Sequence, residues 1–239
     1  MRKLYRMAFT TFLVIGFAGV AAAQNSTVPA SSANSAGQPG LIVVQEDVLI
    51  PLIDQPEHHF RMASRYFAKG DRNQAAAQIR VGAAMVKLEA GRNNATNKTG
   101  LDAAAKGLDD VAAGVTSGSV KSPKDLNDAF ARADLALARH YHEMAKESEA
   151  RNEHGNTGYW LQGTADSLGD SAHWSGRELA KAGSASVNDA RSLGLKLEGG
   201  AQWTAAEVKK SVSDLGSEIN SLDGHASNTV TPTGGSASN

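Results

Sequence analysis

Proline is almost missing from most of this chain: between Pro56 and Pro232 only Pro123 occurs. Because proline interrupts both helices and central strands, long elements are allowed nearly everywhere in this interval. Alanine is frequent there, aromatic residues are few, and apolar residues recur at steps of three and four. That spacing is typical of amphipathic helices. We therefore predict an all-α fold in which antiparallel helical hairpins pack as a bundle.

Helix start and stop signals predict where the individual helices lie. Two capping-box sequences stand out, one at Ser122 with Pro123 behind it, and one formed by Thr204 and Glu207. The predicted helices run from Asp54 to Gly70, from Asp71 to Gly91, over about 99–115, from Ser122 through 136–154, over about 157–182, over about 187–197, and from Thr204 to about Leu222. The segment 41–54 is rich in Val and Ile and is broken by proline, so we expect an extended N-terminal arm.

The first 23 residues have the pattern of a secretory signal peptide, with a basic start, an apolar run and a small-residue site ending at Ala23. Cleavage there predicts a periplasmic or secreted protein without stable membrane insertion. We interpret 24–40 as a flexible linker, 41–223 as the helical domain and 224–239 as a disordered tail, because both flanks are rich in Ser, Gly and Asn. The chain has no cysteine, so packing alone must hold the exported fold.

The charge of the mature chain argues against nucleic acid as a partner. The signal peptide carries three of the 24 basic residues and none of the 25 acidic ones, which leaves 21 − 25 = −4. A net negative chain has no electrostatic attraction to a phosphate backbone or an anionic membrane surface.

Two segments indicate an internal duplication. "VTSGSVKSPKDL" at 115–126 and "LEGGAQWTAAEV" at 197–208 align at a spacing of 82, each with a small-residue turn followed by a helix cap. Chance similarity between alanine-rich helices is the alternative explanation.

The predicted helix over 136–154 carries the best candidate for chemistry. A helical wheel places His140 on the buried stripe, with Glu143 on its flank and His142 on the opposite, solvent-facing side. A His and a Glu three residues apart can share a metal ion, and His58 and His59 could complete a site for zinc or another divalent ion. The alternative is a histidine at the edge of the core that bonds one carboxylate, which the absence of an HExxH pattern favours.

The predicted helix over 157–182 has two faces, of which one is apolar and one combines small polar residues with tryptophan. Trp160, Ser167 and Trp174 share the second face, together with Thr164 and Ser171. This face could seat a neighbouring helix of the same chain. Tryptophan is also enriched at binding surfaces, so the three residues are our candidates for partner binding.

The segment "YFAKGDRNQAAAQIRVGAAMVKLEA" at 66–90 resembles one tetratricopeptide-type hairpin, with Gly70 and Asp71 at the turn. In outline it is also similar to the exported helical proteins of the YfdX family. The resemblance implies a helical-hairpin scaffold and a stress-related exported protein. The 34-residue tandem spacing of tetratricopeptide arrays is missing, and no catalytic residue follows from the resemblance.

These observations favour an exported, non-enzymatic helical binding or scaffold protein of the bacterial cell envelope, with a protein partner there. No nucleophile elbow, phosphate loop or catalytic triad pattern occurs in the sequence. We therefore predict no catalytic residue and no cofactor. The alternative is a periplasmic protein that binds a divalent metal through His58, His59, His140 and Glu143.

Overall fold

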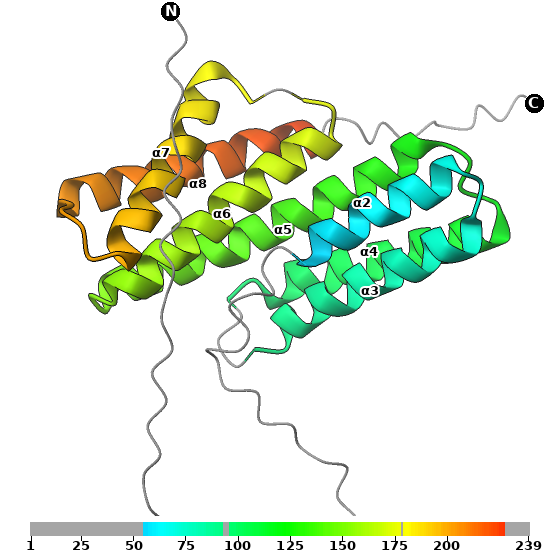
Figure 1. The fold of residues 1–239 in the computed structure, drawn as a ribbon, viewed down its shortest axis with the longest axis horizontal. Helices are drawn as coiled ribbons and strands as arrows, with labels where there is room; N and C mark the ends of the chain where they lie inside the picture. The colour runs from blue at the N-terminus through cyan, green and yellow to red at the C-terminus, as the bar shows by residue number, and fades with distance from the viewer. Residues whose placement is uncertain (1–54, 93–95, 178, 228–239) are drawn as a thin grey trace, which may run out of the picture. The chain divides into compact units, whose positions relative to one another are not determined.

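The computed structural model describes residues 55–92, 96–177 and 179–227, and this part of the chain is all-α (Figure 1). Its elements are α2 (Gln55–Ala68), α3 (Arg72–Ala90), α4 (Lys98–Ser117), α5 (Pro123–Ala150), α6 (His154–Trp174), α7 (Lys181–Glu198) and α8 (Ala205–Ser227). The segments predicted to be a signal peptide, a linker and an extended arm, which together span 1–54, lie outside the described residues. None of the described helices is both long and apolar enough to cross a membrane.

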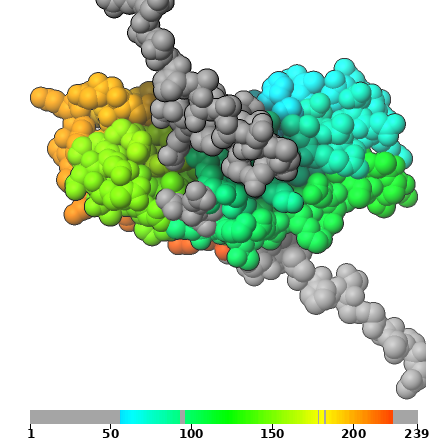
Figure 2. Space-filling model, turned by 90° about the horizontal axis from the view of Figure 1, so that it is seen from below, coloured from blue at the N-terminus to red at the C-terminus, as the bar shows by residue number. Residues whose placement is uncertain are grey.

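Consecutive helices pack against each other as the hairpin prediction requires, and α5 joins two sets of them. It contacts α2 and α4 on one side and α6 and α8 on the other. Figure 1 shows this long helix between α2–α4 and α6–α8, and Figure 2 shows the cyan surface of α2 and α3 apart from the orange surface of α7. Because it has neighbours on two sides, α5 is buried around most of its circumference, including every residue of 133–138.

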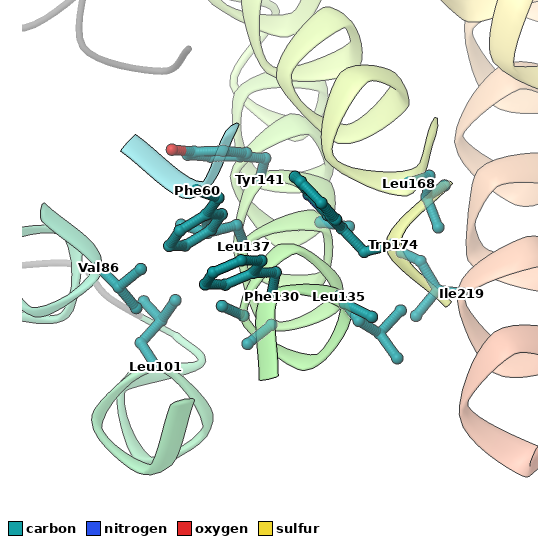
Figure 3. Close-up of a cluster of buried hydrophobic side chains, with 14 of the residues drawn as sticks. Phe60, Val86, Leu101, Phe130, Leu135, Leu137, Tyr141, Leu168, Trp174 and Ile219 are labelled. Atoms are coloured by element: carbon teal, nitrogen blue, oxygen red, sulfur yellow. The ribbon is translucent and has the colours of Figure 1, made fainter. Parts of the chain in front are cut away.

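Aromatic side chains fill the centre of the core (Figure 3). The rings of Phe60 and Phe130 stack with centroids 4.5 Å apart, and Trp174 meets Phe130 edge-on at 5.1 Å. These contacts tie α2 and α6 to α5. Helix α3 approaches closely enough that a Cβ atom at Gly82 would lie 2.5 Å from the Phe60 ring. Glycine is therefore required at that position for the helix to pack.

The predicted caps are confirmed. Asp71 accepts a hydrogen bond from the Gln74 amide at 3.1 Å, and Ser122 accepts one from the Lys124 amide at 3.1 Å. Thr204 and Glu207 bond each other's backbone amides, as a capping box does.

Several predicted helix bounds were wrong, since α5 ends at Ala150 rather than 154 and α7 begins at Lys181 rather than near 187. Helix α6 stops at Trp174 rather than near 182, because Gly176 adopts a left-handed conformation (φ 65°) that terminates it. Helix α8 continues to Ser227, four residues into the segment predicted to be a disordered tail. The remainder of that tail, 228–239, lies outside the described residues.

Helix bounds recur at the spacing that the sequence indicated. Helix α6 begins 82 residues after α3 (72 and 154), α7 begins 83 after α4 (98 and 181), and α8 begins 82 after α5 (123 and 205). Left-handed backbone recurs as well: Gly70 and Asn152 are 82 apart, as are Gly118 and Gly200. The end of α2 likewise precedes the end of α5 by 82 residues. The two halves thus have the same helical layout, while their common ancestry stays a prediction.

Candidate functional site

An open groove of about 460 Å³ lies between α2, α6 and α7 and is lined almost entirely by ionisable side chains. We call it the charged groove. Its lining residues are Glu57, His58 and Arg61 from α2, Asp166 and Asp170 from α6, and Arg191 from α7. Glu57 lies in the first turn of α2, where a carboxylate also offsets the positive end of the helix dipole.

Ion pairs hold the walls of the charged groove in place. Arg61 pairs with Glu57 one turn away on α2 and reaches Asp170 across the groove, with Nη2 3.4 Å from Oδ1. Arg191 Nε lies 2.5 Å from Asp166 Oδ1 and so joins α7 to α6. The Trp174 indole Nε1 donates to Glu57 Oε2 at 2.8 Å. Glu57 is therefore oriented by bonds from two sides.

A buried acid, Asp134 of α5, does not line the groove but is within electrostatic range of Glu57, Arg61 and Asp170. Its side chain is 3% exposed, and its Oδ2 atom has no hydrogen-bond partner. Burial raises the pKa of Asp134 well above its usual range, the negative charges of Glu57 and Asp170 raise it further, and Arg61 opposes them. Burial also raises the pKa of Asp170, to about 6. The structure therefore crowds carboxyl groups where not all of them ionise readily at neutral pH.

A second cluster of buried polar groups surrounds His140. Both ring nitrogens are fully buried without a hydrogen bond, and Nε2 lies 3.7 Å from Oε2 of Glu89. Arg92 Nε approaches the same oxygen at 3.1 Å, and its guanidinium lies over the Trp160 ring at 5.9 Å. Burial, and then Arg92, lower the pKa of His140 to about 4, whereas burial raises the pKa of Glu89 against the effect of Arg92. The imidazole is consequently neutral at physiological pH.

The structure does not gather the four residues predicted to bind metal. His58 lines the charged groove, whereas His59 Nδ1 is 2.6 Å from the Gln78 side-chain oxygen. Glu143 points to Lys146, with Nζ 2.8 Å from Oε2. The carboxylate beside His140 is Glu89 of α3 instead. Across 55–92, 96–177 and 179–227, no three His, Cys, Asp or Glu side chains are placed to hold a metal ion.

The prediction that His142 faces solvent was wrong. Its side chain is 12% exposed, and its Nε2 lies 2.8 Å from the backbone carbonyl oxygen of Val212 in α8. Gly216 allows this approach, because a Cβ atom there would lie 3.2 Å from the imidazole. The helical wheel in the sequence analysis assumed that α5 has one buried stripe, whereas other helices cover it on two sides, so His142 is buried as well.

The face proposed for partner binding lies inside the bundle. Trp160, Ser167 and Trp174 are each 6–7% exposed. The Trp160 ring stacks on Tyr141 of α5 at 5.7 Å, and Ser171 of the same face donates to the Ala131 carbonyl oxygen at 2.8 Å. This face seats α5, which was the intramolecular alternative, and it leaves little side-chain surface for an external partner.

Sequence reasoning missed Asp134, Asp170 and Glu89. Asp134 did leave a signal, because it stands alone as an ionisable residue in the apolar run 133–138. A carboxylate in such a run is rarely buried without a reason. Neither Asp170 nor Glu89 lies in a comparable apolar run. Comparison of the chain with protein-family models, curated proteins and solved structures found no match.

Proposed function

We propose that the mature chain is an exported, non-enzymatic binding or scaffold protein of the bacterial cell envelope, and that it binds through the charged groove. The observation that supports this most is the groove itself, in which five of the six lining side chains, from three helices, are oriented by mutual ion pairs. Charges fixed before binding favour specific recognition, because little ordering of side chains remains to be done. The resemblance to exported YfdX-type proteins extends the proposal to a role in envelope stress.

A single engineered cysteine tests binding at the groove, because the chain has no cysteine of its own. His58→Cys would carry a photo-crosslinker at the exposed edge of the groove. The matched control is Lys209→Cys, which places the same group on an exposed position of α8. We expect the groove variant to capture an envelope protein that the control does not, and Arg191→Glu to reduce the capture. Identical products from both positions would refute groove binding.

Export is tested separately by the mass of the protein in a periplasmic fraction. The sequence predicts a mature chain that begins at Gln24. A chain that stays in the cytoplasm at full length would refute the location.

A second candidate function, binding of a divalent metal such as zinc, is favoured by one observation. His140 Nε2 has no hydrogen bond and lies 3.7 Å from Glu89 Oε2, close to the separation of two ligands whose bonds to zinc are about 2 Å long. The positive charge of Arg92 beside Glu89 opposes it. If metal binds here, zinc should raise the melting temperature of the wild type and of Glu143→Gln but not of His140→Ala or Glu89→Gln. A melting curve unchanged by saturating zinc eliminates this candidate.

A further inference from the structure

We propose that an apolar stripe on the outer side of α3 is the docking site for the segment 44–53 of the same chain. The stripe consists of Val81, Ala84, Met85 and Leu88, and we call it the α3 stripe. None of its residues lines the charged groove, so the inference does not depend on the function proposed for that groove.

Helix α3 has two apolar faces, of which one packs in the core. The core face, which includes Ile79, Ala83 and Val86, is at most 2% exposed. The residues of the α3 stripe recur at steps of three and four on the opposite side of the helix. Val81 is 38% exposed and Leu88 is 52% exposed, and they are two of the three large hydrophobic side chains that are exposed in the described part of the chain. Exposed apolar residues that line up on one side of a helix, rather than occur singly, indicate a surface that packs against something else.

The chain enters α2 beside one end of the α3 stripe. Helices α2 and α3 pack as an antiparallel hairpin, so the start of α2 and the end of α3 lie at the same end of it (Figure 1). The close approach of Phe60 to Gly82 gives the register of the two helices. Gln55, the first residue of α2, lies five residues before Phe60 and is therefore about level with Lys87. The segment that precedes Gln55 thus arrives next to Leu88.

The segment 44–53 has the length and the composition to cover the α3 stripe. Ten residues of extended chain span about 33 Å, whereas Val81 and Leu88 are about 10 Å apart along the helix axis. Six of the ten residues are Val, Leu or Ile. The other flanks of the mature chain, 24–40 and 228–239, are rich in Ser, Gly and Asn and offer few side chains that gain from burial. Among these flanking segments, 44–53 is therefore the occupant that an apolar surface selects.

The charges of the two surfaces are also complementary. The charged residues of the segment are Glu46 and Asp47, both acidic. The exposed charged residues of α3 are Arg72, Arg80 and Lys87, all basic. Opposite charges around an apolar contact favour the correct pairing of two surfaces more than they add to its strength.

Photo-crosslinking within the mature chain tests the assignment. Leu49→Cys gives the protein its one cysteine, within the segment, and a benzophenone maleimide is attached to it. Mass spectrometry of the digested monomer then identifies the peptide that is crosslinked, which we expect to contain 81–88. A tethered segment also meets nearby surfaces by chance, so the yield is compared with that of a variant carrying Val81→Asp and Leu88→Asp. The yield should fall about fivefold or more, because the variant loses two apolar contacts and places acids opposite an acidic segment.

The matched control is Leu195→Asp, which changes the third exposed hydrophobic residue, on α7, and should leave the yield unchanged. A cooperative melting curve for each variant shows that it is folded. Crosslinks without preference for 81–88, or a yield that the two α3 substitutions leave unchanged, would overturn the assignment.

A second copy of the chain is the competing occupant, and light scattering of the unlabelled mature chain distinguishes it. We expect the mass of a monomer for the wild type and for the variant with Val81→Asp and Leu88→Asp. A wild-type dimer that these substitutions dissociate would assign the α3 stripe to a second copy and overturn docking of 44–53.

Discussion

Replacement of His140 by leucine should change the stability of the protein by an amount that depends on pH. His140 is fully buried, both ring nitrogens lack a hydrogen bond, and Arg92 lies nearby. Leucine is the residue 82 positions later, at the corresponding point of α8, so a side chain of this size and polarity suits the shared layout. Near pH 7.5 we expect His140→Leu to be as stable as the wild type or more stable, because an unsatisfied polar group is removed.

The magnitude at lower pH follows from the lowered pKa of His140, about 4 against 6.5 in the unfolded chain. Between these values the unfolded chain binds a proton that the folded chain refuses, so stability falls as the pH drops below about 6.5. From about pH 7.5 to about pH 4.5 the wild type should lose about 2.5 kcal/mol through this residue alone, and His140→Leu should not. Carboxyl groups with raised pKa values, such as that of Asp170, act in the opposite direction, but they are present in both proteins.

Urea denaturation followed by tryptophan fluorescence gives the free energy of unfolding of both proteins at the two pH values. The free energy of unfolding of His140→Leu minus that of the wild type should be larger by about 2.5 kcal/mol at the lower pH than at the higher pH. His173→Leu, which removes an exposed imidazole, provides the control. A difference between wild type and His140→Leu that stays constant within about 0.5 kcal/mol would refute the assignment of a buried, neutral imidazole.

Substitutions at four further positions test the packing, the caps and the groove. Gly158→Ala should destabilise the protein by about 1–3 kcal/mol, because the added Cβ atom would lie 2.6 Å from the Gly194 carbonyl oxygen. Gly107→Ala should stabilise it by about 0.5–1 kcal/mol, because the space around Gly107 is open. Thermal melting of the two variants measures both effects. Ser122→Ala should cost about 1 kcal/mol by removing the cap of α5, and Ser122→Asp should preserve it, as urea denaturation would show. Asp170→Asn should raise the melting temperature at about pH 7.5 and lose that advantage towards about pH 4. The reason is that a carboxyl group whose pKa is raised by folding destabilises the folded chain only when the pH is above the pKa of that group in the unfolded chain.

The fold was largely predictable because its determinants are local. The caps at Asp71, Ser122 and Thr204 are read from a few adjacent residues, and each of them holds in the structure. The stop of α6 was missed although Gly176 is visible in the sequence, because a single glycine inside a helical pattern is often tolerated. Helical periodicity therefore indicated which segments are helices, and single residues decided where they end.

The candidate sites were harder to predict because burial depends on how many neighbours a helix has. The wheel for α5 placed His140 correctly on a buried stripe, but it gave no information about a second covered side and so put His142 in water. It also could not indicate that Glu89 of α3, rather than Glu143 of the same helix, lies against His140. Contacts between residues distant in sequence, such as the hydrogen bond from Trp174 to Glu57, have no signature in a helical period.

The shared layout of the two halves separates residues needed for folding from residues that need another explanation. Core positions such as Ile79 and Val86 correspond at 82 residues to Leu161 and Leu168, and both members of each pair are buried. The buried ionisable residues match less well: the positions 82 residues after Glu89, Asp134 and His140 are Ser171, Gly216 and Leu222, although His140 itself lies 82 residues after His58 of α2. The two halves therefore share their apolar core positions, whereas the ionisable residues buried beside that core differ from one half to the other.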